Sequence, residues 1–227
     1  MSVSSAATPT VPSHAAGSTA GHPGWRRLAA AAAIGAPLAE LLSVALGVDH
    51  TSDNDRQLDI IHAHTGSFVT MVLLEQVCYT LVAVTAVAIA LRLASSRGGR
   101  IAGVGAVLAV VGAGASLNGF GGALPTLARP ELRETALYFL DHLGPIYNVT
   151  LGLAMLVHVG LLTIFVALWR SGRVAWPWLA ISAVALVTSA VIGDGRVANV
   201  LAMLALTGGF VGIARFLAQP AVTDRRA

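Results

Sequence analysis

Two carboxylic acids lie deep inside apolar stretches of the sequence, Glu40 in the first stretch and Glu75 in the second. Counted along a helix at about 1.5 Å per residue, both are expected roughly 12–14 Å below the same membrane surface. An ionised carboxyl at that depth costs several kcal/mol, so such residues normally face the bundle interior and serve binding or proton transfer. Their shared depth predicts a pocket that binds a proton, a cation or a small molecule. A packing role, with each carboxyl hydrogen-bonded to another helix, is the alternative.

One face of the second stretch carries further residues of interest. His64, Phe68, Met71, Glu75 and Tyr79 recur every three or four residues, the spacing of a single helix face. This face would connect a surface histidine to the buried carboxyl. The rise of the helix separates His64 from Glu75 by ~16 Å, so water or hydroxyl groups would have to carry a proton between them. The alternative is that Glu75 alone faces the interior.

Polar residues also occur within the later stretches. His158 lies in the middle of the fourth, and no other histidine lies deep in a stretch. A haem held by two histidines is therefore disfavoured, and His158 is expected to relay protons or to pack. Four more polar residues stand toward the outer ends of the third to sixth stretches: Asn118, Asn148, Asp194 and Asn199. We predict an outward-facing polar cavity. Its predicted proton- or ligand-binding residues are Asn118, Asn148, Asp194, Glu40, Glu75, Tyr79, His64 and His158.

Several other chemistries are excluded by composition or spacing. The chain has no Lys, which excludes Schiff-base chemistry. Cys78 is the only cysteine, so an intrachain disulfide or thiol pair is excluded and a packing role is expected. His62 and His64 would point ~200° apart on a helix and could not share a metal ion. We expect neither a metal nor a cofactor, although a solvated site of His and Asp on the outer loops is the alternative.

Six near-continuous apolar stretches must position these residues. The 227-residue chain is 56% hydrophobic and 11% charged, with a mean hydropathy of +0.75. About 20 apolar residues of helix cross a bilayer, and soluble domains are about 25% charged. The sequence predicts an all-α, polytopic integral membrane protein with one six-helix bundle over residues 25–218. The bundle is flanked by a disordered cytoplasmic tail, residues 1–24, and a short cytoplasmic tail, residues 219–227. The stretches are Leu28–Val48, Ser67–Leu93, Ile101–Leu124, Ile146–Trp169, Trp176–Ile192 and Val197–Leu217.

The connections carry helix signals of their own. Thr51 and Ser52 are good caps, so the second helix is expected to start above the membrane and continue down into it. Pro130, followed by apolar residues at helical spacing up to Leu143, predicts a short amphipathic helix on the outer surface. The third stretch is rich in small residues over positions 103–119, which predicts a place at the centre of the bundle.

Arginine distribution predicts the orientation. With the N-terminus inside, ten of the 14 Arg and all four Trp lie at the inner boundary, and the acidic residues gather outside. Both termini are therefore expected in the cytoplasm, in the cell membrane. Arg26-Arg27 resembles the start of a signal peptide, but Glu40 interrupts its apolar region and five stretches follow, so a retained helix is predicted. The Arg residues are dispersed rather than interleaved with aromatics, so a nucleic-acid partner is excluded.

Three functions are compatible with this pattern. The leading hypothesis is a non-enzymatic membrane protein that binds a small molecule or cation, as a proton-coupled small transporter or transport accessory. Its surroundings would be membrane lipid, and its small size suggests a homo-oligomer. The second is an intramembrane enzyme of the isomerase or cyclase type, whose paired carboxyls act as acid and base on a lipid-like substrate. The third is a structural or assembly protein.

Overall fold

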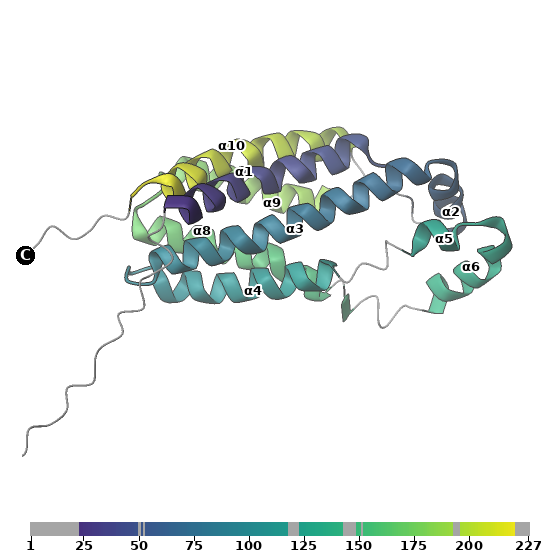
Figure 1. Cartoon of the computed structure of the whole chain (residues 1–227), viewed down its shortest axis with the longest axis horizontal. Helices are drawn as coiled ribbons and strands as arrows, with labels where there is room; N and C mark the ends of the chain where they lie inside the picture. Colours follow the sequence, from purple (N-terminus) through teal and green to yellow (C-terminus); the bar gives the residue numbers. More distant parts are fainter. Residues whose placement is uncertain are drawn as a thin grey trace, which may run out of the picture.

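The computed structural model describes residues 23–49, 51, 53–117, 123–142, 149–150, 152–192 and 196–220. Within these ranges the regular structure is helical, with no strand. Figure 1 shows long helices side by side and a group of short helices beyond one end of them. In chain order the elements are α1 (Pro23–Leu46), α2 (Asn54–Ala63), α3 (Thr65–Leu93), α4 (Gly99–Leu117), α5 (Leu124–Leu127), the 3-10 turn η3 (Pro130–Leu132), α6 (Arg133–His142), α8 (Leu156–Ser171), α9 (Trp176–Ile192) and α10 (Arg196–Ala218).

Five of these helical segments are long and apolar enough to cross a membrane, so the chain is an all-α, multi-pass membrane protein. They are Pro23–Leu46, Thr65–Leu93, Gly99–Leu117, Gly152–Ser171 and Val197–Ala218. The sixth predicted span is α9, which has 17 residues. A helix of that length rises about 25 Å, less than the roughly 30 Å of a hydrocarbon core. A sixth crossing by α9 therefore stays a prediction.

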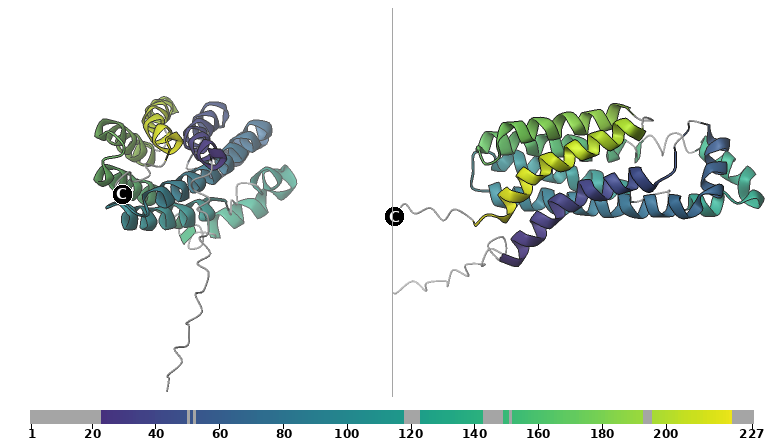
Figure 2. Two further views of the ribbon diagram at one scale, coloured as in Figure 1. Left: turned by 60° about the vertical axis from the view of Figure 1, so that its left-hand side comes forward. Right: turned by 90° about the horizontal axis from the view of Figure 1, so that it is seen from above.

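The long helices form a ring. Going round it, α3 packs on α4, α4 on α8, α9 on α10, α10 on α1, and α1 on α3 (Figure 2). The remaining side, between α8 and α9, is closed over only a short stretch. These two helices follow each other in sequence through Gly172, whose φ of 64° ends α8 in the left-handed conformation.

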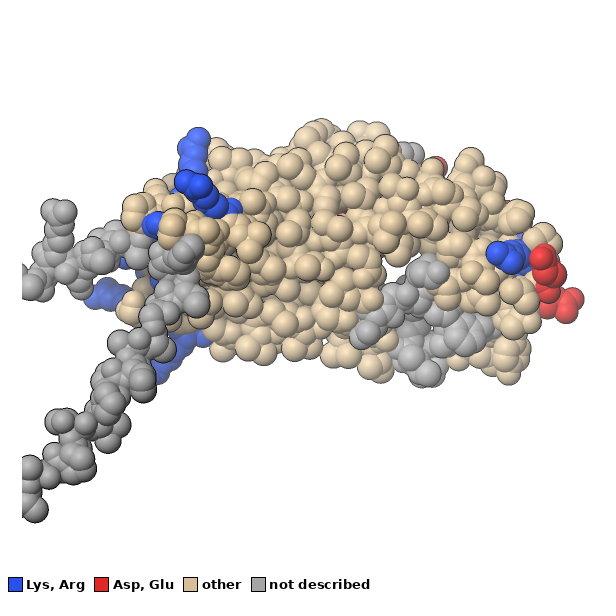
Figure 3. Space-filling view, in the orientation of Figure 1, with Lys and Arg blue, Asp and Glu red and all other residues tan. Residues whose placement is uncertain are grey.

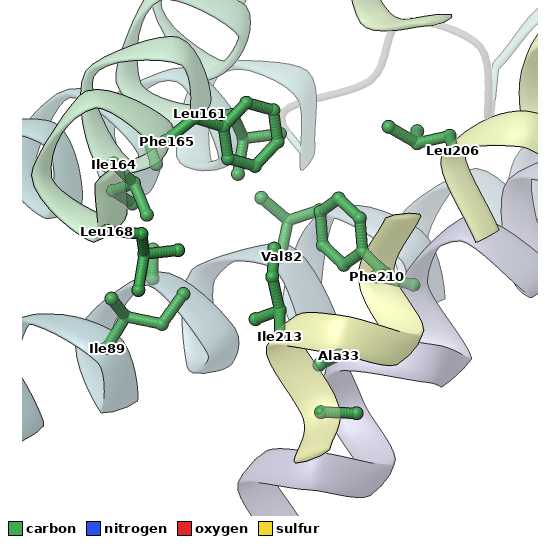
Figure 4. Close-up of a cluster of buried hydrophobic side chains, with 14 of the residues drawn as sticks. Ala33, Val82, Ile89, Leu161, Ile164, Phe165, Leu168, Leu206, Phe210 and Ile213 are labelled. Carbon is green, nitrogen blue, oxygen red and sulfur yellow. The ribbon is translucent and has the colours of Figure 1, made fainter. Parts of the chain in front are cut away.

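Large apolar side chains fill the ring at the end where the described chain starts and finishes. Phe165 and Phe210 meet edge to face, with ring centroids 6.0 Å apart (Figure 4). Toward that end of the bundle, Ile89, Leu168 and Ile213 are almost wholly buried. This half of the interior is therefore a packed hydrophobic core.

Alanine and glycine set the spacing between helices. The α4–α8 contact is so close that a Cβ atom added at Gly105 would lie 2.8 Å from the carbonyl oxygen of Gly160. The predicted place of the third span at the bundle centre is wrong, because α4 packs mainly on α3 and α8 and exposes its other face. Val107 on that face is 64% exposed, and Gly114 has open space around it.

Charged side chains gather at the two ends of the long axis, with both signs at the end that carries the acidic groups (Figure 3). Arg side chains gather at the end where the described chain starts and finishes, and acidic side chains mark the far end. Arg92 joins the ends of two helices there: its guanidinium donates to the carbonyls of Leu217, at 2.9 Å, and Gln219, at 2.7 Å. The same group lies 4.6 Å from the ring centre of Phe216.

The short helices form a cap with its own hydrophobic cluster, made of Leu58, Ile61, Phe68, Met71, Ala128 and Ala136. Helix α2 is separate from α3 because His64, between them, has a non-helical backbone (φ −126°, ψ 39°). The predicted continuous helix is therefore wrong. Its predicted caps also differ, since the Asp53 carboxylate accepts from the backbone N–H groups of Asp55 and Arg56.

The helix predicted to start at Pro130 is present as η3 and α6. Ala136 is buried in the cap cluster, and Leu137 and Leu140 pack against it. Protein contacts thus cover these apolar residues, and a position of α6 on the membrane surface stays a prediction.

Arg133 ties α6 to α2. Its Nε donates to Asp55 Oδ1 at 2.9 Å, and its Nη1 donates to Asp59 Oδ1. The hydrogen bond from Arg133 lowers the pKa of Asp59, and the charge of Arg133 adds to this effect. The pair is exposed, so we expect it to order the cap rather than to dominate global stability.

We predict that Gly112→Ala destabilises the bundle, because the new Cβ would collide with the backbone of Val157, which cannot move aside. Overpacking of this kind costs about 1–3 kcal/mol, which should lower the Tm of the purified protein by several degrees. Gly114→Ala on the same helix meets open space and is the matched control. Equal melting temperatures for the two variants would contradict the close α4–α8 contact.

We predict that Arg133→Gln speeds backbone hydrogen exchange in residues 54–63 and 133–142 at neutral pH. Exposed Arg129, for which the described residues show no ion pair, gives the control Arg129→Gln. In the wild type, the folded pKa of Asp59 lies below its ordinary value of 3.8. The stabilisation is therefore complete above that pH and is lost as the pH falls below it. Unchanged exchange in Arg133→Gln would show that the cap is held by apolar contacts alone.

Candidate functional site

A cavity of about 170 Å³ lies inside the ring, bounded by α1, α3, α8, α9 and α10. Its walls are mainly aliphatic and aromatic. The lining residues able to form hydrogen bonds are Glu40, Cys78, Tyr79, His158 and Asn199. The cavity therefore combines an apolar surface with a few polar groups from four different helices, the usual composition of a small-molecule site.

Helix α1 brings its carboxyl into this space through its alanine face. Ala33 and Ala36 are fully buried, so α1 lies close to its neighbours, and Glu40 continues the same face one turn further on. Pro37, which also lines the cavity, has no N–H to donate to the carbonyl of Ala33. The backbone of α1 is thus locally weakened beside its only carboxyl.

Phe210 forms the floor of the cavity. It is the lining residue of α10 nearest the packed half of the bundle, and its ring contacts Phe165 on the other side. Figure 4 shows Val82, Leu161 and Leu206, which also line the cavity, around this floor. The polar space is therefore closed by apolar side chains on the side of the Arg-rich end.

Two residues that line the cavity each have a buried atom without a hydrogen bond. Among the described residues, neither Glu40 Oε2 nor His158 Nδ1 has a partner. The thiol of Cys78, on the neighbouring helix α3, lies beside the Glu40 carboxyl. A buried polar atom without a partner costs roughly 1–3 kcal/mol, so both atoms are sites where an occupant of the cavity would be stabilised.

Glu75 has a different environment from Glu40. It does not line the cavity, and Ser43 Oγ donates to its Oε1 at 3.4 Å. Because Glu75 is bonded to Ser43, which lies three residues after Glu40 on α1, the two carboxyls are offset by about one helical turn, ~5 Å. The matched depth predicted from the sequence is wrong by this offset, although both carboxyls lie close to Cys78 and Tyr79.

Tyr79 lines the cavity, and its hydroxyl lies near Ser116 of α4. His64 lies elsewhere, in a separate surface pocket of about 420 Å³ beside Arg56 and Ser67. Phe68 and Met71, 3% and 5% exposed, fill the helix face between His64 and Glu75. The polar route predicted along that face is therefore blocked by the apolar cap cluster.

Three predicted site residues, Asn118, Asn148 and Asp194, lie outside the described residues. The structure adds Cys78 and Asn199 to the cavity, where the sequence indicated only packing for the first and a general polar position for the second. The feature of the sequence that could have identified Cys78 as a cavity residue is its spacing, three residues after Glu75. Within the described ranges, no group of three or more His, Cys, Asp or Glu side chains could hold a metal ion.

Comparison with known proteins gives no family assignment. The chain matches no protein-family model, no curated protein and no solved structure. Its function must therefore be inferred from the chemistry of the cavity.

We predict that Ser43→Ala destabilises the protein. Ser43 is 1% exposed and links α1 to α3 through the Met71 carbonyl and Glu75. Removing this donor should cost about 1 kcal/mol or more, measured as a lower Tm in detergent. Exposed Thr80, which bonds only the Gln76 carbonyl of its own helix among the described contacts, gives the control Thr80→Ala. A Tm unchanged in both variants would show that Ser43 is not a structural link.

Proposed function

We propose that this membrane protein binds a small molecule or cation in the central cavity, and that ligand and proton compete for Glu40. It would act as a small proton-coupled transporter or as a transport accessory. The observation that carries the proposal is the pair of unpartnered buried atoms, Glu40 Oε2 and His158 Nδ1, which belong to two residues that line one cavity. A single occupant could bond to both.

The size of the cavity supports an occupant larger than one water molecule. A volume of about 170 Å³ corresponds to roughly five or six waters at liquid density. A structural or assembly protein would be expected to fill this space with side chains, as the half beyond Phe210 is filled. The cavity therefore favours binding over a purely structural role.

The proposal includes an orientation. Six crossings, counting α9, would place both termini in the cytoplasm at the Arg-rich end, with the cap outside. The cavity would then lie on the outer side of the Phe165–Phe210 floor, and transport would require this aromatic pair to separate. Membrane lipid would surround the exposed aliphatic side chains, and a homo-oligomer is part of the same proposal.

The test is a thermal-shift screen of the purified protein. The panel contains amines, alcohols and carboxylic acids of about benzene size, together with Na⁺ and K⁺. A ligand at a hundred times its Kd stabilises the folded state by about 2.7 kcal/mol, which should raise the Tm by ~5–10 °C. We expect at least one member of the panel to do so in the wild type and not in Glu40→Gln.

A second pair of variants tests the position of the site. Leu206→Trp adds bulk inside the cavity, and Leu204→Trp adds the same bulk on the same helix at a position that is 51% exposed. Only the first should abolish the Tm shift. If no member of the panel stabilises the wild type, or if Leu206→Trp binds normally, the cavity is not a ligand site.

A further inference from the structure

Two residues that line the cavity each have a buried, unpartnered atom that can accept a hydrogen bond. Among the described residues no Arg lines it, and an ionised Glu40 would be the only full charge that they bring to it. The thiol of Cys78 lies beside Glu40, the hydroxyl of Tyr79 lies near Ser116, and the amide of Asn199 has both donors and an acceptor. Glu40 Oε2 accepts when ionised, and Nδ1 of a neutral His158 accepts in one of its two tautomers. An occupant that donates hydrogen bonds and carries positive charge would satisfy these two acceptors.

The walls are suited to an organic cation. The cavity is bordered by the aromatic side chains of Tyr79 and Phe210 and by the thioether of Met203. Aromatic faces attract ammonium groups, most strongly when water is excluded, and thioethers are soft and polarisable. Leu161 and Leu186 complete an apolar surface for the rest of such a molecule.

A bare metal ion fits less well. Ions such as Ca²⁺ and Mg²⁺ take about six or more oxygen ligands. The lining offers oxygen-bearing side chains only at Glu40, Tyr79 and Asn199. In contrast, an apolar cavity of about 150 Å³ admits benzene, so the volume of about 170 Å³ suits a ligand of that size with one amino group.

On the premise of the proposed function, we infer that the ligand is a small organic ammonium. Its N–H groups donate to Glu40 Oε2 and His158 Nδ1, and its apolar part lies against Phe210. Binding to protonated Glu40 releases one proton to solution, because the carboxylic O–H bond breaks while the ammonium keeps all its protons. The proton and the ammonium therefore exchange one for one at the same oxygen.

Other titratable groups surround Glu40 and must be separated from it. On α3 these are Cys78, Tyr79 and nearby Glu75, and on α8 it is His158. The residues that line the cavity from α9 and α10 are not titratable. His158→Gln keeps a hydrogen-bonding side chain and cannot titrate, so it distinguishes a proton lost from Glu40 from one lost from His158.

The experiment compares benzylammonium with benzyl alcohol, which has nearly the same shape and no charge. Each is titrated by calorimetry into the full chain in lipid nanodiscs, with empty nanodiscs as the blank, in two buffers of different ionisation heat. We expect benzylammonium to bind at least tenfold more tightly than the alcohol and to release up to one proton. The affinity should fall as the pH is lowered. Glu40→Gln should lose the release and weaken binding at least tenfold, whereas His158→Gln should retain the release.

The outcomes separate the ligand class from the proposed function. Equal binding of the alcohol and the ammonium, both abolished by Leu206→Trp, would overturn the ammonium assignment and leave the cavity as a ligand site. Binding of neither probe, together with a silent thermal-shift panel, would overturn both. If Glu40→Gln does not fold, the ammonium assignment is tested by the proton release and the pH dependence of the wild type. The absence of both would overturn it. The exposed-site variant Glu131→Gln should match the wild type.

Discussion

Close approach of helix backbones across alanine and glycine faces is the constraint on which the bundle depends. In a membrane, apolar burial gives little drive for helices to associate, so tight packing must supply it. The buried alanines of α1 and the contact of Gly105 with Gly160 place these backbones too close for larger side chains. The ring of six helices that results must fill its own centre, and it does so fully only on one side of Phe210.

The same packing gives two similar carboxyls different chemistry. Glu75 meets a serine across the α1–α3 contact, where the helices touch and a donor is available. Glu40 points from the same contact toward the unfilled centre, where one of its oxygens is buried without a donor among the described residues. A shift of one helical turn thus determines whether an intramembrane acid holds helices together or is free to exchange a proton.

The helices were predictable because a run of apolar residues and its length determine a membrane helix almost alone. The place of Glu40, Tyr79 and His158 in the interior followed from the cost of exposing polar groups to lipid. The one-turn offset of Glu75 was not predictable, since the register between two helices depends on how their side chains interlock. Glycines misled the placement of α4, because Gly105 and Gly114 look alike in sequence and only one contacts another helix.

The side of the ring between α8 and α9 has the least contact to lose. Both helices line the cavity, and the left-handed glycine at position 172 begins the short connection between them. Separating α8 from α9 while α9 stays packed on α10 breaks fewer interactions than separating any other neighbouring pair. The easiest deformation of this protein would therefore widen the cavity sideways, as a gate into the acyl chains of the bilayer, before it opened any passage along the bundle axis.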